Sequence, residues 1–107
     1  MPKQTSQSRA LIGDIAPKLA ALTDDVLFGD VWDRPGLSHR DRSLITVAAL
    51  VALYRGGQLP GHLNRALDNG VTKDEIIELI THLAFYSGWP TAVEAMTTAK
   101  AVFAKRD

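Results

Sequence analysis

The chain has 107 residues, of which 46% are apolar, and its 12 basic and 12 acidic side chains cancel to a formal net charge of zero. This length is typical of one small domain with a modest core. The balanced charge gives no electrostatic reason to expect nucleic acid or an anionic membrane as a partner. The sequence contains no cysteine, which excludes disulfides, thiolate metal ligands and thiol redox chemistry within it.

The N-terminal segment MPKQTSQSRA is polar and lacks the apolar core of a signal peptide. The longest apolar run, from Ile45 to Leu53, is far shorter than the roughly 20 residues that span a bilayer. We therefore expect a soluble cytoplasmic protein. Residues 1–9 are predicted to be a flexible tail, and residues 10–107 a single helical domain.

In the first third of the chain, apolar residues recur every three or four positions between Ser8 and Leu27. This spacing predicts helix, and Pro17 is expected to divide it into two short pieces. Helical spacing then continues to Trp32, before Arg34-Pro35-Gly36-Leu37 interrupts it. The apolar stripe consists of Leu11, Ile15, Leu19 and Leu22.

The next predicted helix runs from about His39 to Arg55. Ser38 is a favourable N-cap, and Asp41 in the first turn suits the helix dipole. After Ser43 this helix is apolar nearly all round, which is typical of a helix buried on most sides. A domain of this size has few elements with which to cover it, so partner subunits are expected and the chain is predicted to be a homo-oligomer.

Three further helical segments are predicted in the second half of the chain. Leu59 to Leu67 forms a short helix closed by Asn69-Gly70. Thr72 and Glu75 form a capping box for the following helix, which Gly88 ends. Pro90 suits the first turn of a last helix reaching about Lys105. With no alternating strand pattern, the predicted fold is an all-α compact bundle of about five to six helices.

Candidate chemistry lies on the fifth predicted helix. Glu78, His82 and Tyr86 follow one another at fourfold spacing and so share one side of the helix. His62 sits beside Leu63 at the margin of the apolar stripe of the preceding helix, whereas His39 is expected to be exposed. We expect His62 and His82 to meet in one pocket. The alternative is that both are structural histidines and that Glu78 belongs to a solvated edge.

Three arginines, Arg34, Arg40 and Arg42, surround the Pro-Gly turn. Salt bridges to neighbouring aspartates account for Arg34 and Arg40, while Arg42 is nearer the apolar part of its helix and could clamp a carboxylate. A metal site is not expected, because the histidines and Glu78 lack His-Glu-x-x-His spacing. No glycine-rich phosphate loop or nucleophile elbow is present.

Three motifs resemble the carboxymuconolactone decarboxylase family: Trp-x-Arg-Pro-Gly-Leu-Ser-x-Arg-x-Arg-Ser, His-Leu-x-x-Ala-Leu-x-Asn-Gly-Val-Thr and Tyr-x-Gly-x-Pro-x-Ala. The resemblance covers about Phe28 to Phe103. It implies an all-α, alkyl hydroperoxidase-like fold that assembles as trimeric or hexameric rings. It also implies either cofactor-free decarboxylation of a carboxylated lactone in aromatic catabolism, or dithiol peroxidase chemistry.

The peroxidase branch of that family uses Cys-x-x-Cys where this chain has Arg55-Gly-Gly-Gln58, so thiol peroxidase activity is disfavoured here. For the decarboxylase branch we hypothesise that His62 is proton donor or electrophile and that His82 and Tyr86 orient or stabilise an oxyanion. The residues expected to bind the substrate are Arg42, Trp32, Trp89 and Glu78. Simple packing would also explain both tryptophans.

The chain departs from the family pattern after the Tyr-x-Gly-x-Pro motif. Decarboxylases of the pathway often carry Asn in this block, whereas this chain has Val93-Glu94. A carboxylate there would repel an anionic substrate if it faced the pocket. The expected partner is a small carboxylate or lactone, with no cofactor and no metal. The alternative function is a non-catalytic oligomeric binding module of the same fold.

Overall fold

The computed structural model describes residues 6–107 and shows α-helices, one π-helical and one 3-10 segment, and no strand within that range. This confirms the all-helical prediction. The chain divides into two compact units, with the boundary between Leu37 and Ser38. None of the described helices is long and apolar enough to cross a bilayer. That residues 10–107 make a single domain stays a prediction.

The first unit contains α1 (Gln7–Ile12), α2 (Pro17–Leu22), a π-helical segment (Thr23–Phe28) and a 3-10 turn (Val31–Asp33). Pro17 begins α2, in agreement with the predicted division of this stretch. The helix α1 begins at Gln7, inside the range 1–9 predicted as a tail, and residues 1–5 of that range lie outside the described part of the chain.

Polar contacts hold the start of the first unit. The carboxylate of Asp24 accepts hydrogen bonds from the hydroxyls of Ser6 and Ser8 and pairs with Arg9 at 2.8 Å. The Ser6 hydrogen bond, together with the Arg9 and Ser8 bonds, holds the pKa of Asp24 below its usual value. The apolar stripe predicted here is largely exposed, with Ile15 at 81%. Two six-residue helices give this stripe little surface to pack on.

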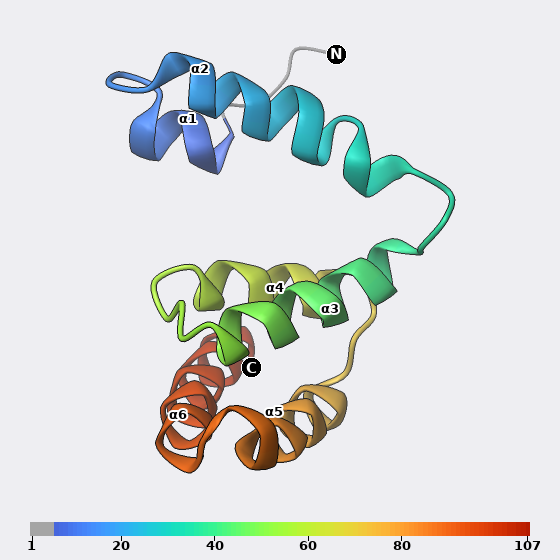
Figure 1. Cartoon of the computed structure of the whole chain (residues 1–107), viewed down its shortest axis with the longest axis vertical. Coiled ribbons are helices and arrows are strands. Elements are labelled where there is room, and N and C mark those ends of the chain that lie inside the picture. The colour runs from blue at the N-terminus through green and yellow to red at the C-terminus, as the bar shows by residue number, and fades with distance from the viewer. Residues whose placement is uncertain (1–5) are drawn as a thin grey trace. The chain divides into compact units, whose positions relative to one another are not determined.

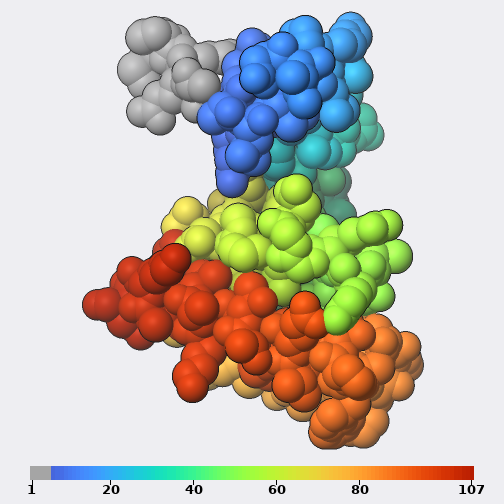
Figure 2. Space-filling model, turned by 90° about the vertical axis from the view of Figure 1, so that its left-hand side faces the viewer, coloured from blue at the N-terminus to red at the C-terminus, as the bar shows by residue number. Residues whose placement is uncertain are grey.

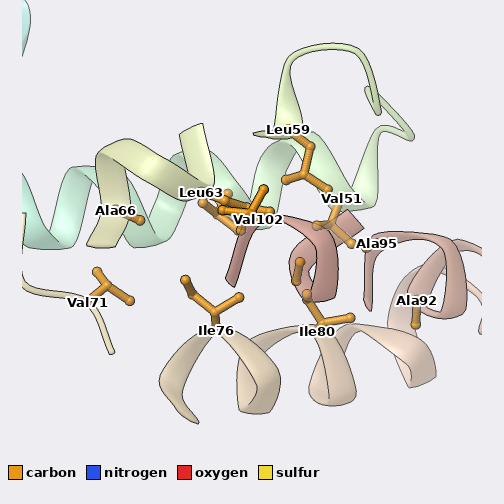
Figure 3. Close-up of a cluster of buried hydrophobic side chains, with 12 residues drawn as sticks. Val51, Leu59, Leu63, Ala66, Val71, Ile76, Ile80, Ala92, Ala95 and Val102 are labelled. Atoms are coloured by element: carbon orange, nitrogen blue, oxygen red, sulfur yellow. The ribbon is translucent and has the colours of Figure 1, made fainter. Parts of the chain in front are cut away.

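The second unit contains α3 (His39–Ala52), α4 (Leu59–Asp68), α5 (Lys73–Ser87) and α6 (Trp89–Arg106). Both α4 and α5 pack on α3 and α6, so the core lies among all four helices (Figure 1). Ile76 and Ile80 of α5 point toward Leu63 of α4 and Val102 of α6 across this core (Figure 3). This arrangement places α4 and α5 on opposite sides of the hydrophobic cluster.

The helix ends follow the local signals of the sequence. The backbone N–H of Asp41 donates to the Ser38 hydroxyl at 3.0 Å, which confirms the cap of α3. Both hydrogen bonds of the Thr72–Glu75 capping box are present at the start of α5. Gly88, with φ of 114°, ends α5 and leads directly into α6. At this φ a side chain would be strained, which explains the glycine.

The helix α3 differs from its prediction in length and in burial. It ends at Ala52 rather than near Arg55. Its buried residues, Ser43, Val47 and Val51, lie on one face, whereas Ile45 is 55% exposed. Neighbours within the chain therefore cover about one side of this helix.

A polar contact fixes α3 against α4. The hydroxyl of Ser43 is buried, and it accepts a hydrogen bond from the Asn69 side-chain amide at 2.9 Å. Asn69 is the C-terminal cap of α4, so the start of α3 lies beside the end of α4. The two helices therefore run antiparallel.

Candidate functional site

His62 lies in the first turns of α4, one residue before the fully buried Leu63. One residue along a helix turns a side chain by about 100°, so His62 stands at the flank of the core face and is half-buried. Burial, followed by the positive charge of Arg65, lowers the pKa of His62 below its usual value. At neutral pH the imidazole is therefore neutral, and its N–H can donate a hydrogen bond without a change of charge.

Arg42 lies in the first turns of α3. It is half-buried and precedes Ser43, whose partner Asn69 closes α4. Seven residues separate His62 from Asn69, which corresponds to about 10 Å along the helix. Arg42 and His62 therefore lie toward opposite ends of the antiparallel helix pair.

His82 and Tyr86 come together on α5. Their ring centroids are 4.8 Å apart, with the planes tilted by 31°. Both side chains are exposed, Tyr86 at 77%, and Glu78 one turn earlier is exposed as well. The sequence-predicted edge of three polar groups is thus a continuous surface in the structure.

This edge faces away from the core. His82 follows the fully buried Ile80 by two residues, which turns its side chain by about 200°. His62 belongs to α4, whose Leu63 faces Ile76 and Ile80 of α5 across the same hydrophobic cluster (Figure 3). Within one chain the structure therefore brings His82 to Tyr86, and it does not bring this pair to His62.

The two tryptophans lie in different surroundings. Trp32 is buried in the first unit, with its ring 5.5 Å from Phe28. Trp89 is 62% exposed, meets Phe85 edge-on at 5.6 Å, and lines a groove of about 350 Å³ between α5 and α6. These two helices lie side by side along one face of the second unit (Figure 2). Trp89 is therefore associated with the α5 edge.

Comparison with known proteins assigns the chain to a family. The model of the carboxymuconolactone decarboxylase family matches residues 17–101. The chain belongs to this family. The resemblance drawn from the three sequence motifs is thereby confirmed.

Two curated decarboxylases are among the similar proteins. The 4-carboxymuconolactone decarboxylase of Acinetobacter baylyi is 41% identical over 101 residues, which cover 94% of this chain and 75% of that protein. The nitrosuccinic acid decarboxylase npaB of Metarhizium robertsii is 42% identical over 69 residues, 64% of this chain and 48% of that protein. An uncharacterized 15.0 kDa protein of Paracoccus denitrificans is 30% identical over 95 residues, 87% of this chain and 71% of that protein.

The structure also shows the surroundings of Glu94, the acidic residue in the block where decarboxylases of the family often carry Asn. Its carboxylate accepts a hydrogen bond from the Tyr54 hydroxyl, which raises the pKa of Tyr54. Tyr54 has a φ of 61°, a left-handed conformation that is uncommon outside glycine. Both residues line a small hollow beside Gly56, where α3 ends and the loop to α4 begins. Glu94 therefore belongs to this hollow.

Sequence reasoning also missed the partner of Arg40. Its guanidinium pairs with Glu75 of α5, in addition to Asp41 at 3.6 Å. The ion pair joins the starts of α3 and α5 and lowers the pKa of Glu75, after the larger effect of the Thr72 backbone N–H. A structural role for Arg40 was expected, with an aspartate as the partner. Among residues 6–107 no three His, Asp or Glu side chains are grouped as metal ligands would be.

Proposed function

We propose that this chain is a decarboxylase that acts on a small carboxylated lactone or acid. Two similar proteins from different organisms are named as decarboxylases, one of 4-carboxymuconolactone and one of nitrosuccinic acid. The observation that carries the proposal is the neutral, half-buried imidazole of His62 on an antiparallel helix pair that also bears Arg42.

Both named substrates make the same chemical demand. Cleavage of the bond to the carboxylate releases CO2 and leaves its electron pair on the adjoining carbon. The lactone in one substrate and the nitro group in the other can accept that pair as negative charge on oxygen. A donor must stabilise this oxygen, and a proton must then reach carbon.

The residues of this chain supply those roles as follows. The guanidinium of Arg42 anchors a carboxylate that is retained through the reaction. The N–H of His62 donates to the oxygen that becomes negative, and His82 with Tyr86 delivers the proton or orients the substrate. Glu78 holds the His82 ring, and Trp89, which is associated with the same edge of α5, excludes water from the reacting carboxylate. The reaction needs no cofactor or metal in this scheme.

The proposed assembly, compartment and pathway follow from membership of the family. We propose a homo-oligomer, trimeric or hexameric, that works in the cytoplasm on intermediates of aromatic-compound breakdown. The exposed faces of α3 and α5 leave apolar surface for such contacts. No nucleic acid or membrane has a part in this function.

The test uses the purified protein with 4-carboxymuconolactone and with nitrosuccinic acid, followed by CO2 release. We expect turnover of at least one of them, and His62→Ala should lower kcat by about 100-fold or more, the range of a lost general acid–base group. His39→Ala is the matched control, because His39 is an exposed histidine in the first turn of α3, and it should retain activity.

The competing function is a non-catalytic binding module. In that case neither compound loses CO2, while the protein still changes the fluorescence of Trp89 on titration with one of them. A His39→Ala variant as inactive as His62→Ala would contradict the assignment of His62.

A further inference from the structure

The polar groups of the proposed site form two separate halves within one chain. One half lies on the α3–α4 side, with His62, Arg42 and Arg65. The other lies on the outer edge of α5, with Glu78, His82 and Tyr86. The hydrophobic cluster lies between α4 and α5, with Leu63 of α4 on one side and Ile76 and Ile80 of α5 on the other (Figure 3).

The two halves carry opposite charge. Arg65 is exposed beside His62 and is near enough to act on its charge. Glu78 is exposed one turn from His82. An edge that bears a carboxylate is electrostatically complementary to a flank that bears two guanidinium groups.

The α5 edge also has the composition of a protein interface. Phe85 is 75% exposed next to Tyr86 and Trp89, and the apolar α5–α6 groove adjoins them. Exposed aromatic side chains clustered at one place are enriched in the centres of interfaces and uncommon on free surfaces. This surface therefore calls for a covering partner.

We propose that the α5 edge of a second copy of this chain, with its Glu78, His82 and Tyr86, docks on the α4 flank around His62 and Arg65 and completes the active site. This inference rests on the proposed decarboxylase function and specifies that each catalytic site is built from two copies. The flank and the edge are different surfaces, so the contact is heterologous and repeats until a ring closes. Every chain in the ring then contributes to two sites.

The first experiment tests the contact without relying on activity. The chain has no native cysteine, so single cysteines can be placed freely. Arg65→Cys and Thr81→Cys chains, with tags of different mass, are co-expressed and treated with a short bis-maleimide; Thr81 lies beside His82 and is exposed. We expect a product that joins the two differently tagged chains.

The control pairs Arg65→Cys with Ala101→Cys, since Ala101 is exposed on α6 and is not among the residues that line the groove. That pair should give no linked product. Linkage only between chains that carry the same cysteine would reveal an isologous contact and overturn the proposal, as would the absence of any linked product.

The second experiment tests the composite site. His62→Ala and His82→Ala chains are each expected to lose about 100-fold or more in kcat. When the two are co-expressed, random assembly in a heterologous ring pairs an intact α4 flank with an intact α5 edge in about one quarter of the sites. We therefore expect about one quarter of wild-type activity to return.

The two experiments separate the possible failures. Cross-linking with an inactive wild type would leave the assembly standing and overturn the decarboxylase function. An active wild type whose co-expressed variants form mixed assemblies by native mass spectrometry but recover no activity would overturn the composite site.

Discussion

The position of His62 gives its titration a predictable effect on stability. The imidazole is half-buried beside a guanidinium group, and both conditions disfavour its protonated form. Its pKa in the folded chain is therefore below that of an unfolded chain, about 6.5. Between these two values the unfolded chain binds a proton that the folded chain does not, so folding loses stability as the pH falls.

We predict that the unfolding free energy of the wild type falls as the pH is lowered from 7 toward 5, and that His62→Gln reduces this slope. Urea unfolding at several pH values measures it. Asp24 and Glu75 also have lowered pKa values, but they lose stability only below their ordinary values of 3.8 and 4.5. An identical slope in wild type and variant would contradict the lowered pKa of His62.

At the residue scale, contacts between residues close in the sequence were predictable, and contacts between distant residues were not. Fourfold spacing on α5 places His82 beside Tyr86, because that contact is local. The bonds from Tyr54 to Glu94 and from Arg40 to Glu75 join residues 40 and 35 positions apart. No periodic pattern encodes such pairs. The expected meeting of His62 with His82 depends on which face of the core each helix covers, which is also a long-range property.

Among the elements, α5 has the best-defined start. The Thr72 hydroxyl accepts a hydrogen bond from the Glu75 N–H at 3.0 Å, while the Glu75 carboxylate accepts one from the Thr72 N–H at 3.0 Å. The same Glu75 pairs with Arg40 at the start of α3. The cap therefore links the beginnings of two core helices as well as starting one of them.

We predict that Thr72→Ala lowers the unfolding free energy by about 1 kcal/mol, the usual effect of losing a threonine N-cap. Thr81→Ala is the matched control, since its hydroxyl donates to the Ile77 carbonyl on the exposed side of the same helix and caps no helix end. That change should stay within about 0.5 kcal/mol. Equal losses for the two variants, measured by urea unfolding, would show that the cap has no special role.

Element ends were predictable because capping chemistry is local, as Ser38, Thr72 and Gly88 show. Burial was less predictable. The run of apolar residues in α3 predicts burial on most sides, yet Ile45 is 55% exposed. A hydrophobic pattern shows that a helix prefers to be covered, and it does not show whether the cover belongs to the same chain.

The whole molecule presents apolar surface on both units. In the first unit only Ala20 and Trp32 are buried among the residues described. A segment this short buries too little surface to be stable by itself. In the second unit the exposed aromatics Phe85, Tyr86 and Trp89 adjoin the α5–α6 groove. Self-association would cover such surfaces, which agrees with the proposed ring.

We predict that sedimentation equilibrium gives a mass several times the chain mass of 11.6 kDa. Replacing the aromatic pair, as Phe85→Ser with Trp89→Ser, should shift the mass toward that of one chain, because the centre of the contact is lost. Ala101→Ser, at an exposed position of α6 that does not line the groove, should leave the mass unchanged. A wild type that sediments as a monomer at micromolar concentration would contradict the ring.

The buried bond between Ser43 and Asn69 has a consequence for the geometry of the α3–α4 flank. If α3 slid past α4 by one helical turn, the Asn69 amide would face hydrocarbon and the Ser43 hydroxyl would lose its donor. The bond therefore fixes the position of α3 along α4. In the proposed site, the bond sets the offset between Arg42 and His62 along the helix pair, and with it the length of compound that those two residues could bind.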